Sequence, residues 1–351
     1  MKGTSFVSLL FAMVAMVLIL GGSPGWAESV VIIPLGSQEG EFCVGDRALL
    51  FEDPTGVRVL IAPGRTVRGS RDPRLGGRVD VLLIDHPHTD HLGNVLDTNC
   101  SGSTTAPFEF PAQGNAPEIA ARLNSAVVVG GEMGSYFTQK ILNVRGTAPP
   151  GCPAEGFDNA FTVPRTAPCV GGIRGGTRMA VAAGESEGVK FTTIPAFHGA
   201  GAPPALVDPP GVAPGLTAYA GTETGFIIRF TNGLTVLWTG DSGLLGDWAT
   251  QSEMYGVNLA VIHADGSFSM GQEEGAFAVL NLIKPRTVIP EHMNQVSTAG
   301  GAVVAGTRVE RLMQLLRAPA RQFPPSRPPK VIVPLSGVPI FCSGSGNCTQ
   351  Q

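Results

Sequence analysis

The sequence predicts a mixed α/β fold. Short apolar runs typical of strands alternate along the chain with stretches whose apolar residues recur at helical spacing. One hairpin is clearly marked, because Asn232-Gly233 separates two apolar runs, 226–230 and 234–238. We find neither a short internal repeat nor a linker that divides the 351 residues, so a single domain is expected.

Strands are predicted where apolar or β-branched residues lie between turn residues. These runs span residues 30–35, 48–51, 57–61, 81–84, 126–129, 191–194, 226–230, 234–238, 258–262, 287–289 and 330–334. Helices are predicted for residues 116–123, 273–283 and 304–316. Two Gly- and Pro-rich stretches show little regular pattern and are predicted to be inserted loops, either lids or surface padding: about 146–184 and 199–221.

The first 27 residues have the pattern of an export signal. Lys2 precedes an apolar run over residues 6–20, and Ala27 offers a small residue for cleavage. A membrane anchor is the alternative, but the run is shorter than the roughly 20 residues of a span, and Pro24 breaks the helix. We therefore expect an exported protein, periplasmic or extracellular, with residues 28–351 as one mature domain and no membrane anchor after cleavage.

The cysteines agree with export. All six lie in the predicted mature chain and none falls in a metal-binding motif. An even number of cysteines in an exported chain predicts disulfides, although six cysteines allow about 15 sets of pairs. Proximity along the sequence favours Cys152 with Cys169 and Cys342 with Cys348, which leaves Cys43 with Cys100.

The chain is weakly acidic, with a formal net charge of −4 that becomes −5 when Lys2 leaves with the signal. This charge disfavours a general nucleic-acid binder, and a small-molecule substrate is expected instead. Five arginines crowd the segment before residues 81–84. They are either a solvated loop or a rim that attracts an anionic substrate: Arg65, Arg68, Arg71, Arg74 and Arg78.

The most informative stretch is His86-Pro87-His88-Thr89-Asp90-His91. It holds three of the chain's six histidines and a carboxylate where a predicted strand passes into a loop. Imidazole nitrogens and carboxylate oxygens are ligands for zinc, manganese or iron. A lone histidine on a strand is usually structural, but this cluster predicts a transition-metal site.

The spacing His-x-His-x-Asp-His resembles the signature of the metallo-β-lactamase superfamily. Three later motifs extend the resemblance over essentially the whole mature chain: Phe197-His198-Gly199, Trp238-Thr239-Gly240-Asp241-Ser242 and Ile289-Pro290-Glu291-His292. Within the superfamily, the run from Asp241 to His292 is most similar to ascorbate-6-phosphate lactonase-like hydrolases. The resemblance implies an αββα sandwich, in which two mixed β-sheets pack face to face, helices cover the outer faces and the metal site lies at one edge.

Carried over by position, the resemblance implies two divalent transition-metal ions, zinc being expected ahead of manganese or iron. The implied ligands are His86, His88 and His198 for the first ion, Asp90, His91 and His292 for the second, and Asp241 as a bridge. A hydroxide shared by the two ions would attack an ester or lactone carbonyl. The alternatives are a phosphodiesterase, a β-lactam hydrolase and a metal-binding module without catalysis.

Two positions depart from the pattern of the superfamily. Ala62 stands where relatives often carry Asp, so a carboxylate that supports a ligand could be missing. Asp85 stands where Ser or Thr is common. We expect it either to orient an imidazole or to lie on the surface.

His263 is the one histidine outside the implied ligand set and, with Asp90, a candidate catalytic residue. It follows residues 258–262 and resembles a histidine of the superfamily's RNA-processing phosphodiesterases that helps to protonate the leaving oxygen. We hypothesise that it acts as a general acid. Asp265, two residues further on, either orients it or points away. The alternatives are a supporting, substrate-contacting or metal-binding histidine.

Overall fold

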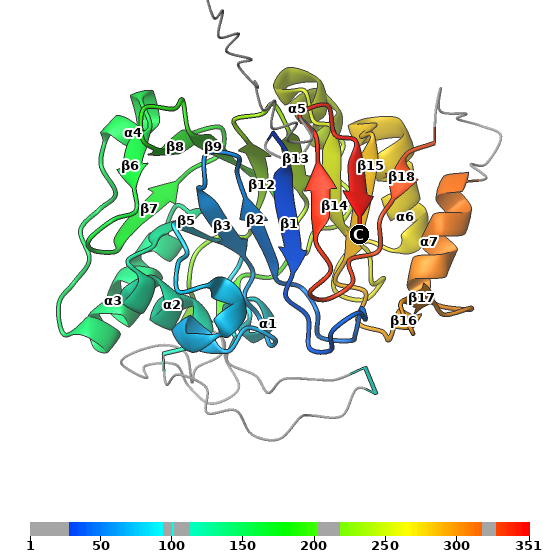
Figure 1. Cartoon of the computed structure of the whole chain (residues 1–351), viewed down its shortest axis with the longest axis horizontal. Helices are drawn as coiled ribbons and strands as arrows, with labels where there is room; N and C mark the ends of the chain where they lie inside the picture. The colour runs from blue at the N-terminus through cyan, green and yellow to red at the C-terminus, as the bar shows by residue number, and fades with distance from the viewer. Residues whose placement is uncertain (1–27, 94–99, 102–112, 203–217, 318–327) are drawn as a thin grey trace, which may run out of the picture.

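The fold is seen in a computed structural model that describes residues 28–93, 100–101, 113–202, 218–317 and 328–351 (Figure 1). The predicted export signal, residues 1–27, and most of the stretch 199–221 lie outside these ranges. Among the helices of the described ranges, none is both long enough and apolar enough for a membrane span.

Two eight-stranded mixed sheets form the body of the molecule. The first sheet has the order β20-β19-β1-β2-β3-β4-β5-β7 and the second β18-β15-β14-β13-β12-β9-β8-β6. The first contains β1 Val30–Pro34, β2 Leu49–Glu52, β3 Arg58–Ile61, β4 Val81–Ile84, β5 Ala126–Gly130, β7 Cys169–Ile173, β19 Ile340–Cys342 and β20 Cys348–Gln350. The second contains β6 Phe161–Val163, β8 Arg178–Ala183, β9 Val189–Pro195, β12 Thr224–Arg229, β13 Thr235–Trp238, β14 Leu259–His263, β15 Thr287–Glu291 and β18 Lys330–Val331.

Helices cover the outer face of each sheet (Figure 1). The first sheet is covered by α2 Asn115–Leu123 and α3 Met133–Arg145, which share an apolar core with it. The second is covered by α5 Asp247–Tyr255, α6 Gln272–Phe277 with its π-helical continuation Ala278–Ile283, and α7 Arg308–Arg317. A third core lies between the two sheets. The predicted αββα sandwich is therefore confirmed.

Strand β4 shows how the sequence places the metal motif. Val81 and Leu83 contribute to the core between the sheets, whereas Leu82 and Ile84 contribute to the core under α2 and α3. A strand buried on both faces needs an uninterrupted apolar run, which the sequence supplies. Because β4 lies between the parallel neighbours β3 and β5, its carboxyl end delivers the following polar residues to one edge of the sheet.

The second sheet supplies the rest of that edge. Strands β13, β14 and β15 are parallel neighbours, so their carboxyl ends meet there. These ends lead to Asp241, His263 and His292 respectively. The predicted convergence of strand ends at one edge of the sandwich is present in the structure.

The prediction of an inserted loop over residues 146–184 is wrong. This stretch contains α4 Glu155–Asp158 and the strands β6, β7 and β8, which extend the ends of both sheets. Glycine hid the pattern, because glycine is a poor strand former. Gly172 is needed for close packing, since an added Cβ would lie 2.5 Å from the carbonyl oxygen of Gly131.

Helix α7 starts at Arg308, four residues later than predicted. Thr307 precedes it, and the hydroxyl of Thr307 accepts a hydrogen bond from the backbone N–H of Glu310 at 3.3 Å. The carboxylate of Glu310 in turn accepts from the N–H of Gly306 at 2.7 Å. This resembles a capping box, whose Thr-x-x-Glu signal marks a helix start better than apolar spacing does.

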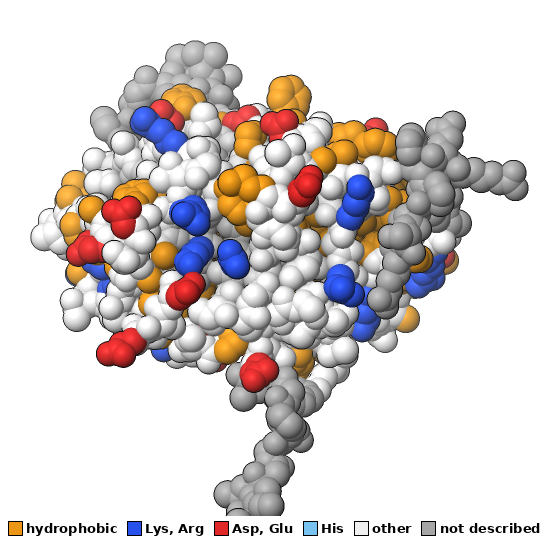
Figure 2. All heavy atoms as spheres, turned by 90° about the horizontal axis from the view of Figure 1, so that it is seen from above, with side chains coloured by type: hydrophobic (Ala, Val, Ile, Leu, Met, Phe, Trp, Pro, Cys, Tyr) orange, Lys and Arg blue, Asp and Glu red, His pale blue; other side chains and the backbone are white. Residues whose placement is uncertain are grey.

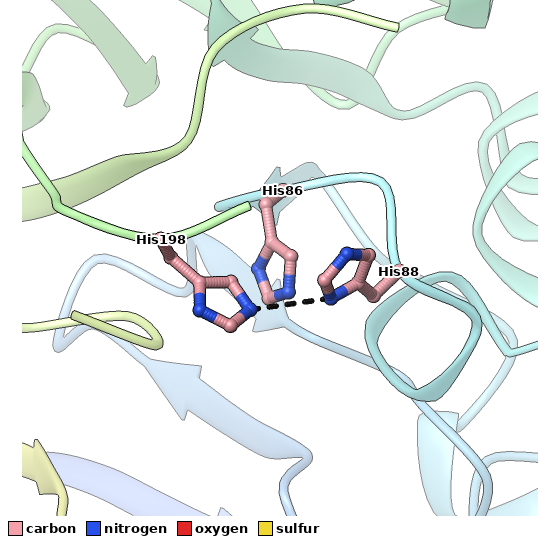
Figure 3. Close-up of side chains that lie close together, drawn as sticks. All are labelled: His86, His88 and His198. Atoms are coloured by element: carbon pink, nitrogen blue, oxygen red, sulfur yellow. Dashed lines mark hydrogen bonds between the residues drawn. The ribbon is translucent and has the colours of Figure 1, made fainter. Parts of the chain in front are cut away.

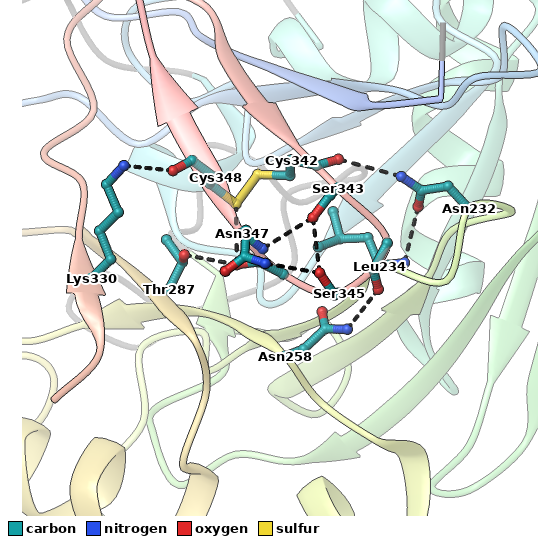
Figure 4. The surroundings of a disulfide bond; sticks show 12 residues. Asn232, Leu234, Asn258, Thr287, Lys330, Cys342, Ser343, Ser345, Asn347 and Cys348 are labelled. Atoms are coloured by element: carbon teal, nitrogen blue, oxygen red, sulfur yellow. Dashed lines mark hydrogen bonds between the residues drawn. A yellow bond between two sulfur atoms is a disulfide. The ribbon is translucent and has the colours of Figure 1, made fainter. Parts of the chain in front are cut away.

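The six cysteines form the three pairs that sequence proximity favoured: Cys43–Cys100, Cys152–Cys169 and Cys342–Cys348. The last pair closes the C-terminal hairpin of β19 and β20, which the sequence did not predict (Figure 4). β19 pairs with β1 of the first sheet. Side chains at the second sheet hydrogen-bond to the hairpin, from Asn258 Nδ2 to Gly344 O at 2.9 Å and from Thr287 Oγ1 to Gly346 O at 2.8 Å. The hairpin therefore joins the two sheets.

Two of the five arginines before β4 form ion pairs with neighbouring carboxylates. Arg74 lies 2.6 Å from the carboxylate of Asp72, and Arg78 lies 2.9 Å from that of Asp80. On the face shown in Figure 2, basic and acidic side chains are interspersed with apolar and neutral ones.

Candidate metal centre

The motif residues leave β4 in two directions. His86 and His88 lie in the extended segment after the strand, and Asp90 and His91 lie in the single turn of α1 Thr89–Leu92. A helical turn directs these last two side chains away from the first two. One hexapeptide therefore supplies ligand atoms to two neighbouring groups of side chains.

The first group consists of three imidazoles, those of His86, His88 and His198 (Figure 3). Nε2 of His198 lies 3.3 Å from Nδ1 of His88. The ring of His86 meets the other two edge-on, at centroid distances of 4.4 and 4.9 Å. His198 comes from the segment after β9, so this group joins both sheets.

The second group consists of Asp90, His91, Asp241 and His292, whose ligand atoms lie within 4.8 Å of one another. Oδ2 of Asp241 lies 3.0 Å from Nε2 of His292 and 3.3 Å from Nε2 of His91. The same oxygen lies 3.7 Å from Nε2 of His86 and 3.9 Å from Nε2 of His198. Asp241 thus lies between the two groups, where the sequence analysis expected a bridging carboxylate.

The residues present fit divalent transition-metal ions. Nε2 of His86 and Nε2 of His91 are buried and make no hydrogen bond within the described part of the chain. A buried imidazole nitrogen left without a partner costs free energy, and a bound cation would remove that cost. The donor set of nitrogen and carboxylate oxygen atoms is the one that zinc, manganese and iron accept.

The charge balance of the site is dominated by Asp241. Burial alone would raise the pKa of Asp241, but the imidazoles of His292 and His91 hold this pKa well below its usual range. In the first group, burial lowers the pKa of His88 to about 4, with a further contribution from His86. Burial alone would lower the pKa of His292, but Asp241 and Asp265 raise it to about 9, and Asp85 and Asp241 hold the pKa of His91 well above its usual value. A metal ion that binds these two imidazoles must therefore displace protons.

Asp85 orients an imidazole, which decides between the two predicted roles. It is buried, and its Oδ1 lies 2.8 Å from Nδ1 of His91 while its Oδ2 accepts a hydrogen bond from the indole of Trp238 at 3.1 Å. Burial alone would raise the pKa of Asp85, but His91 and His86 hold this pKa well below its usual range. Ala62 is a buried core residue.

Asp265 points away from His263 and orients His292. Oδ2 of Asp265 lies 3.2 Å from Nδ1 of His292. Its Oδ1 accepts backbone N–H groups of the turn that follows, from Ser267 at 2.7 Å and Phe268 at 2.8 Å. This decides between the two alternatives that the sequence left open for Asp265.

His263 lies behind the carboxylate of Asp241. Its Nδ1 is 2.7 Å from Oδ1 of Asp241, and its fully buried ring stacks on His292 at a centroid distance of 5.3 Å. Burial lowers the pKa of His263 to about 4. A general acid must reach the leaving group, so this placement argues against the acid hypothesis and favours a role in positioning Asp241.

One residue of the site was missed entirely. Arg47 is buried in the loop before β2, and its Nη2 lies 2.8 Å from Oδ2 of Asp90 and 2.8 Å from Nε2 of His292. A single arginine after Gly45-Asp46 carries no motif, so the sequence offered no signal for it.

Comparisons with known proteins identify the superfamily. Residues 43–292 match the model of the beta-lactamase superfamily domain. The chain is 27% identical over 254 residues to a UPF0173 metal-dependent hydrolase of Cupriavidus necator, covering 71% of each chain. A UPF0173 metal-dependent hydrolase of Pelotomaculum thermopropionicum is 29% identical over 217 residues, which are 62% of this chain and 68% of that protein.

A solved structure shares the fold. Igni18, a metallo hydrolase from Ignicoccus hospitalis, superposes with a TM-score of 0.54 at 19% identity and covers 89% of this chain and 98% of its own. The chain belongs to the metallo-β-lactamase superfamily. Within it, the protein is a metal-dependent hydrolase. Its similarity to the ascorbate-6-phosphate lactonase-like branch stays a prediction.

Proposed function

We propose that the protein hydrolyses an ester or lactone with the help of two divalent transition-metal ions, zinc ahead of manganese or iron. One observation carries the proposal. Oδ2 of Asp241 lies within 3.9 Å of four imidazole Nε2 atoms, two from each group of ligands. A carboxylate so placed suits a pair of ions, since two ions about 3.5–4 Å apart need a shared anionic ligand.

The chain's own residues prepare this site for hydrolysis. Divalent ions, when bound, lower the pKa of water and polarise a carbonyl or phosphoryl oxygen. Asp85 and Asp265 orient His91 and His292, which fixes their ring positions before any substrate arrives. His88, Asp90 and His198 are half-buried whereas the other four proposed ligands are buried, so the site opens to solvent on one side only.

The surroundings suit a small organic substrate with an apolar part. Phe197 is 75% exposed and Phe268 is 64% exposed. Both belong to segments that meet at Ser242, which accepts the N–H of Phe197 on its hydroxyl and the N–H of Met270 on its carbonyl. An aryl or alkyl group could therefore pack beside the residue that follows Asp241.

The phosphodiesterase alternative is disfavoured by the position of His263. That alternative needs an acid at the leaving oxygen, and His263 is fully buried behind Asp241. β-Lactam hydrolysis and metal binding without catalysis use the same ligands, so the choice among these functions is experimental.

The test is a panel of chromogenic esters, lactones, phosphodiesters and β-lactams, assayed on metal-loaded protein with and without chelator. We expect chelator-sensitive turnover of an ester or lactone, and loss of both metal and activity in His88→Ala and Asp241→Ala. Asp247→Ala, an acidic residue at the start of α5 outside the proposed ligand set, is the matched control. Full activity in both ligand variants, or turnover that chelator does not affect, would contradict the proposal.

A further inference from the structure

Arg47 contacts the same ligand atoms that a second metal ion would bind. Its side chain is 2% exposed, and its Nη2 contacts Oδ2 of Asp90 and Nε2 of His292, each at 2.8 Å. These two residues belong to the second group of ligands. In the first group, by contrast, the rings of His86, His88 and His198 face one another.

The position of Arg47 makes this contact a competition with a metal ion. Nε2 of His292 is the atom that the second group offers as a ligand, and Nη2 of Arg47 lies 2.8 Å from it. Asp90 Oδ2, also a proposed ligand atom, lies 2.8 Å from the same Nη2. An ion bound to these two atoms would need the space that the guanidinium fills, so Arg47 and the ion cannot occupy it together.

The guanidinium is held in place from several sides. Nη1 donates to the carbonyl of Gly45 at 3.2 Å. The two hydrogens of Nη2 are taken by the acceptors Oδ2 of Asp90 and Oδ1 of Asn294, each at 2.8 Å. The Cys43–Cys100 pair ties the loop that carries Arg47 to the segment beyond α1. Withdrawal of Arg47 therefore requires several contacts to break together.

We propose that Arg47 makes the second metal site the weaker, conditional one. The first ion binds at His86, His88 and His198 without competition, and the second binds only when Arg47 leaves Asp90 and His292. Arg47 is thus a built-in competitor that sets how many ions the protein carries at a given metal concentration. The inference rests on the ligand assignment of the proposed function, but it concerns metal occupancy and not the reaction.

The experiment is a zinc titration of chelator-stripped full-length mature protein against a chromophoric competing chelator. Wild type should show one tight equivalent and a second that is at least about tenfold weaker, a difference typical of changed support around metal ligands. Arg47→Met should tighten the second equivalent by about tenfold or more and leave the first unchanged. Arg47→Gln, which keeps a hydrogen-bond donor without the charge, should fall between the two.

Arg311→Met is the control. Arg311 lies on α7 and forms an exposed ion pair with Glu273 of α6, so this variant removes the same charge outside the proposed ligand set. It should leave both affinities at wild-type values. Thermal unfolding of each metal-free variant reports folding, and the wild-type titration tests the unequal affinities whether or not Arg47→Met folds. Two indistinguishable tight sites in wild type would overturn the inference, as would an unchanged or weaker second site in folded Arg47→Met and Arg47→Gln.

The inference and the proposed function fail in different ways. If ions bind with the expected two affinities but no substrate is turned over, the hydrolytic function fails and the inference stands. If turnover needs metal but the two ions bind with equal affinity, the role of Arg47 fails and the function stands.

Discussion

Oδ1 of Asp85 lies 2.8 Å from Nδ1 of His91, and both side chains are fully buried. On the other side of the ring, Nε2 of His91 lies 3.3 Å from Oδ2 of Asp241. The indole of Trp238 holds the other oxygen of Asp85. Asp85, just before the metal motif, thus fixes the orientation of His91, a proposed ligand at the end of the motif.

The first prediction follows from this contact. Asp85→Asn removes the negative charge and presents an amide to Trp238 and His91, two donors that one amide oxygen satisfies poorly. We expect zinc affinity to fall by about 10–100-fold, measured by chelator competition. Asp80→Asn is the matched control, because Asp80 is a buried carboxylate at the opposite end of β4. Equal effects in both variants would contradict the prediction.

The second prediction concerns His263. Because its Nδ1 contacts Oδ1 of Asp241 from the buried side, His263→Ala should loosen that carboxylate. We expect weaker metal binding and a fall in kcat of about 10-fold or more that is the same for good and poor leaving groups. His263→Gln, which can still donate to Asp241, should recover part of both. A loss confined to poor leaving groups with metal binding intact would restore the general-acid hypothesis.

Much of the site was predictable because its signals are local. The six residues from His86 to His91 follow an apolar strand, and parallel strand ends must meet at one edge, so Asp241 and His292 could be placed from sequence. Arg47 could not be placed, because its contact with His292 joins residues 245 positions apart and no spacing rule predicts such a pair. The contact exists only because the loop before β2 packs against the second sheet in the folded chain.

The fold was less predictable where tertiary packing overrides local preference. Strands β7 and β8 are held in sheets although they are rich in Gly and Ala, because neighbouring strands and the Cys152–Cys169 pair fix them. The direction of Asp265 could not be decided from sequence. It starts the turn that contains Ser267, and in this turn its carboxylate faces His292.

The third prediction concerns pH. Asp72 is buried, and its carboxylate accepts hydrogen bonds from Nε and Nη2 of Arg74 at 2.9 and 2.6 Å. Burial alone would raise the pKa of Asp72, but Arg74 holds it below its usual value. A lowered pKa in the folded state means that this stability is present above the unfolded pKa of about 3.9 and is lost as pH falls through the folded value.

Asp72→Asn should therefore reduce the free energy of unfolding by about 1–3 kcal/mol at pH 7. The difference from wild type should be constant from pH 7 to about 5 and should shrink below about pH 4. Urea unfolding of both metal-free proteins across this range measures it. A difference that grows on acidification would show that the sign is wrong.

The fourth prediction is export with processing. The positive, apolar and small-residue pattern ending at Ala27 and the even number of cysteines motivate it. Protein recovered from its native compartment should begin at residue 28 and contain no thiol that alkylates without reductant. Intact-mass spectrometry before and after reduction measures both features. Retention of Met1 or six free thiols would contradict the prediction.

The last prediction ranks two of the cysteine pairs by the length of chain that each closes. Cys43–Cys100 joins residues 57 positions apart, whereas Cys342–Cys348 joins residues 6 apart. A longer closed loop removes more entropy from the unfolded chain, so the first pair should stabilise the fold by about 2 kcal/mol more than the second.

The comparison uses the double variants Cys43→Ser/Cys100→Ser and Cys342→Ser/Cys348→Ser in urea unfolding of metal-free protein. The first should unfold at the lower urea concentration. It should also bind its second zinc ion more tightly than wild type, because the loop that carries Arg47 is no longer tied to the segment beyond α1. The C-terminal double variant should not change zinc affinity, since its hairpin contacts the sheets through Asn258 and Thr287 and not through proposed metal ligands. Greater destabilisation by the C-terminal pair would contradict the entropic ranking, and unchanged zinc affinity in the first variant would show that the tie does not hold Arg47 in place.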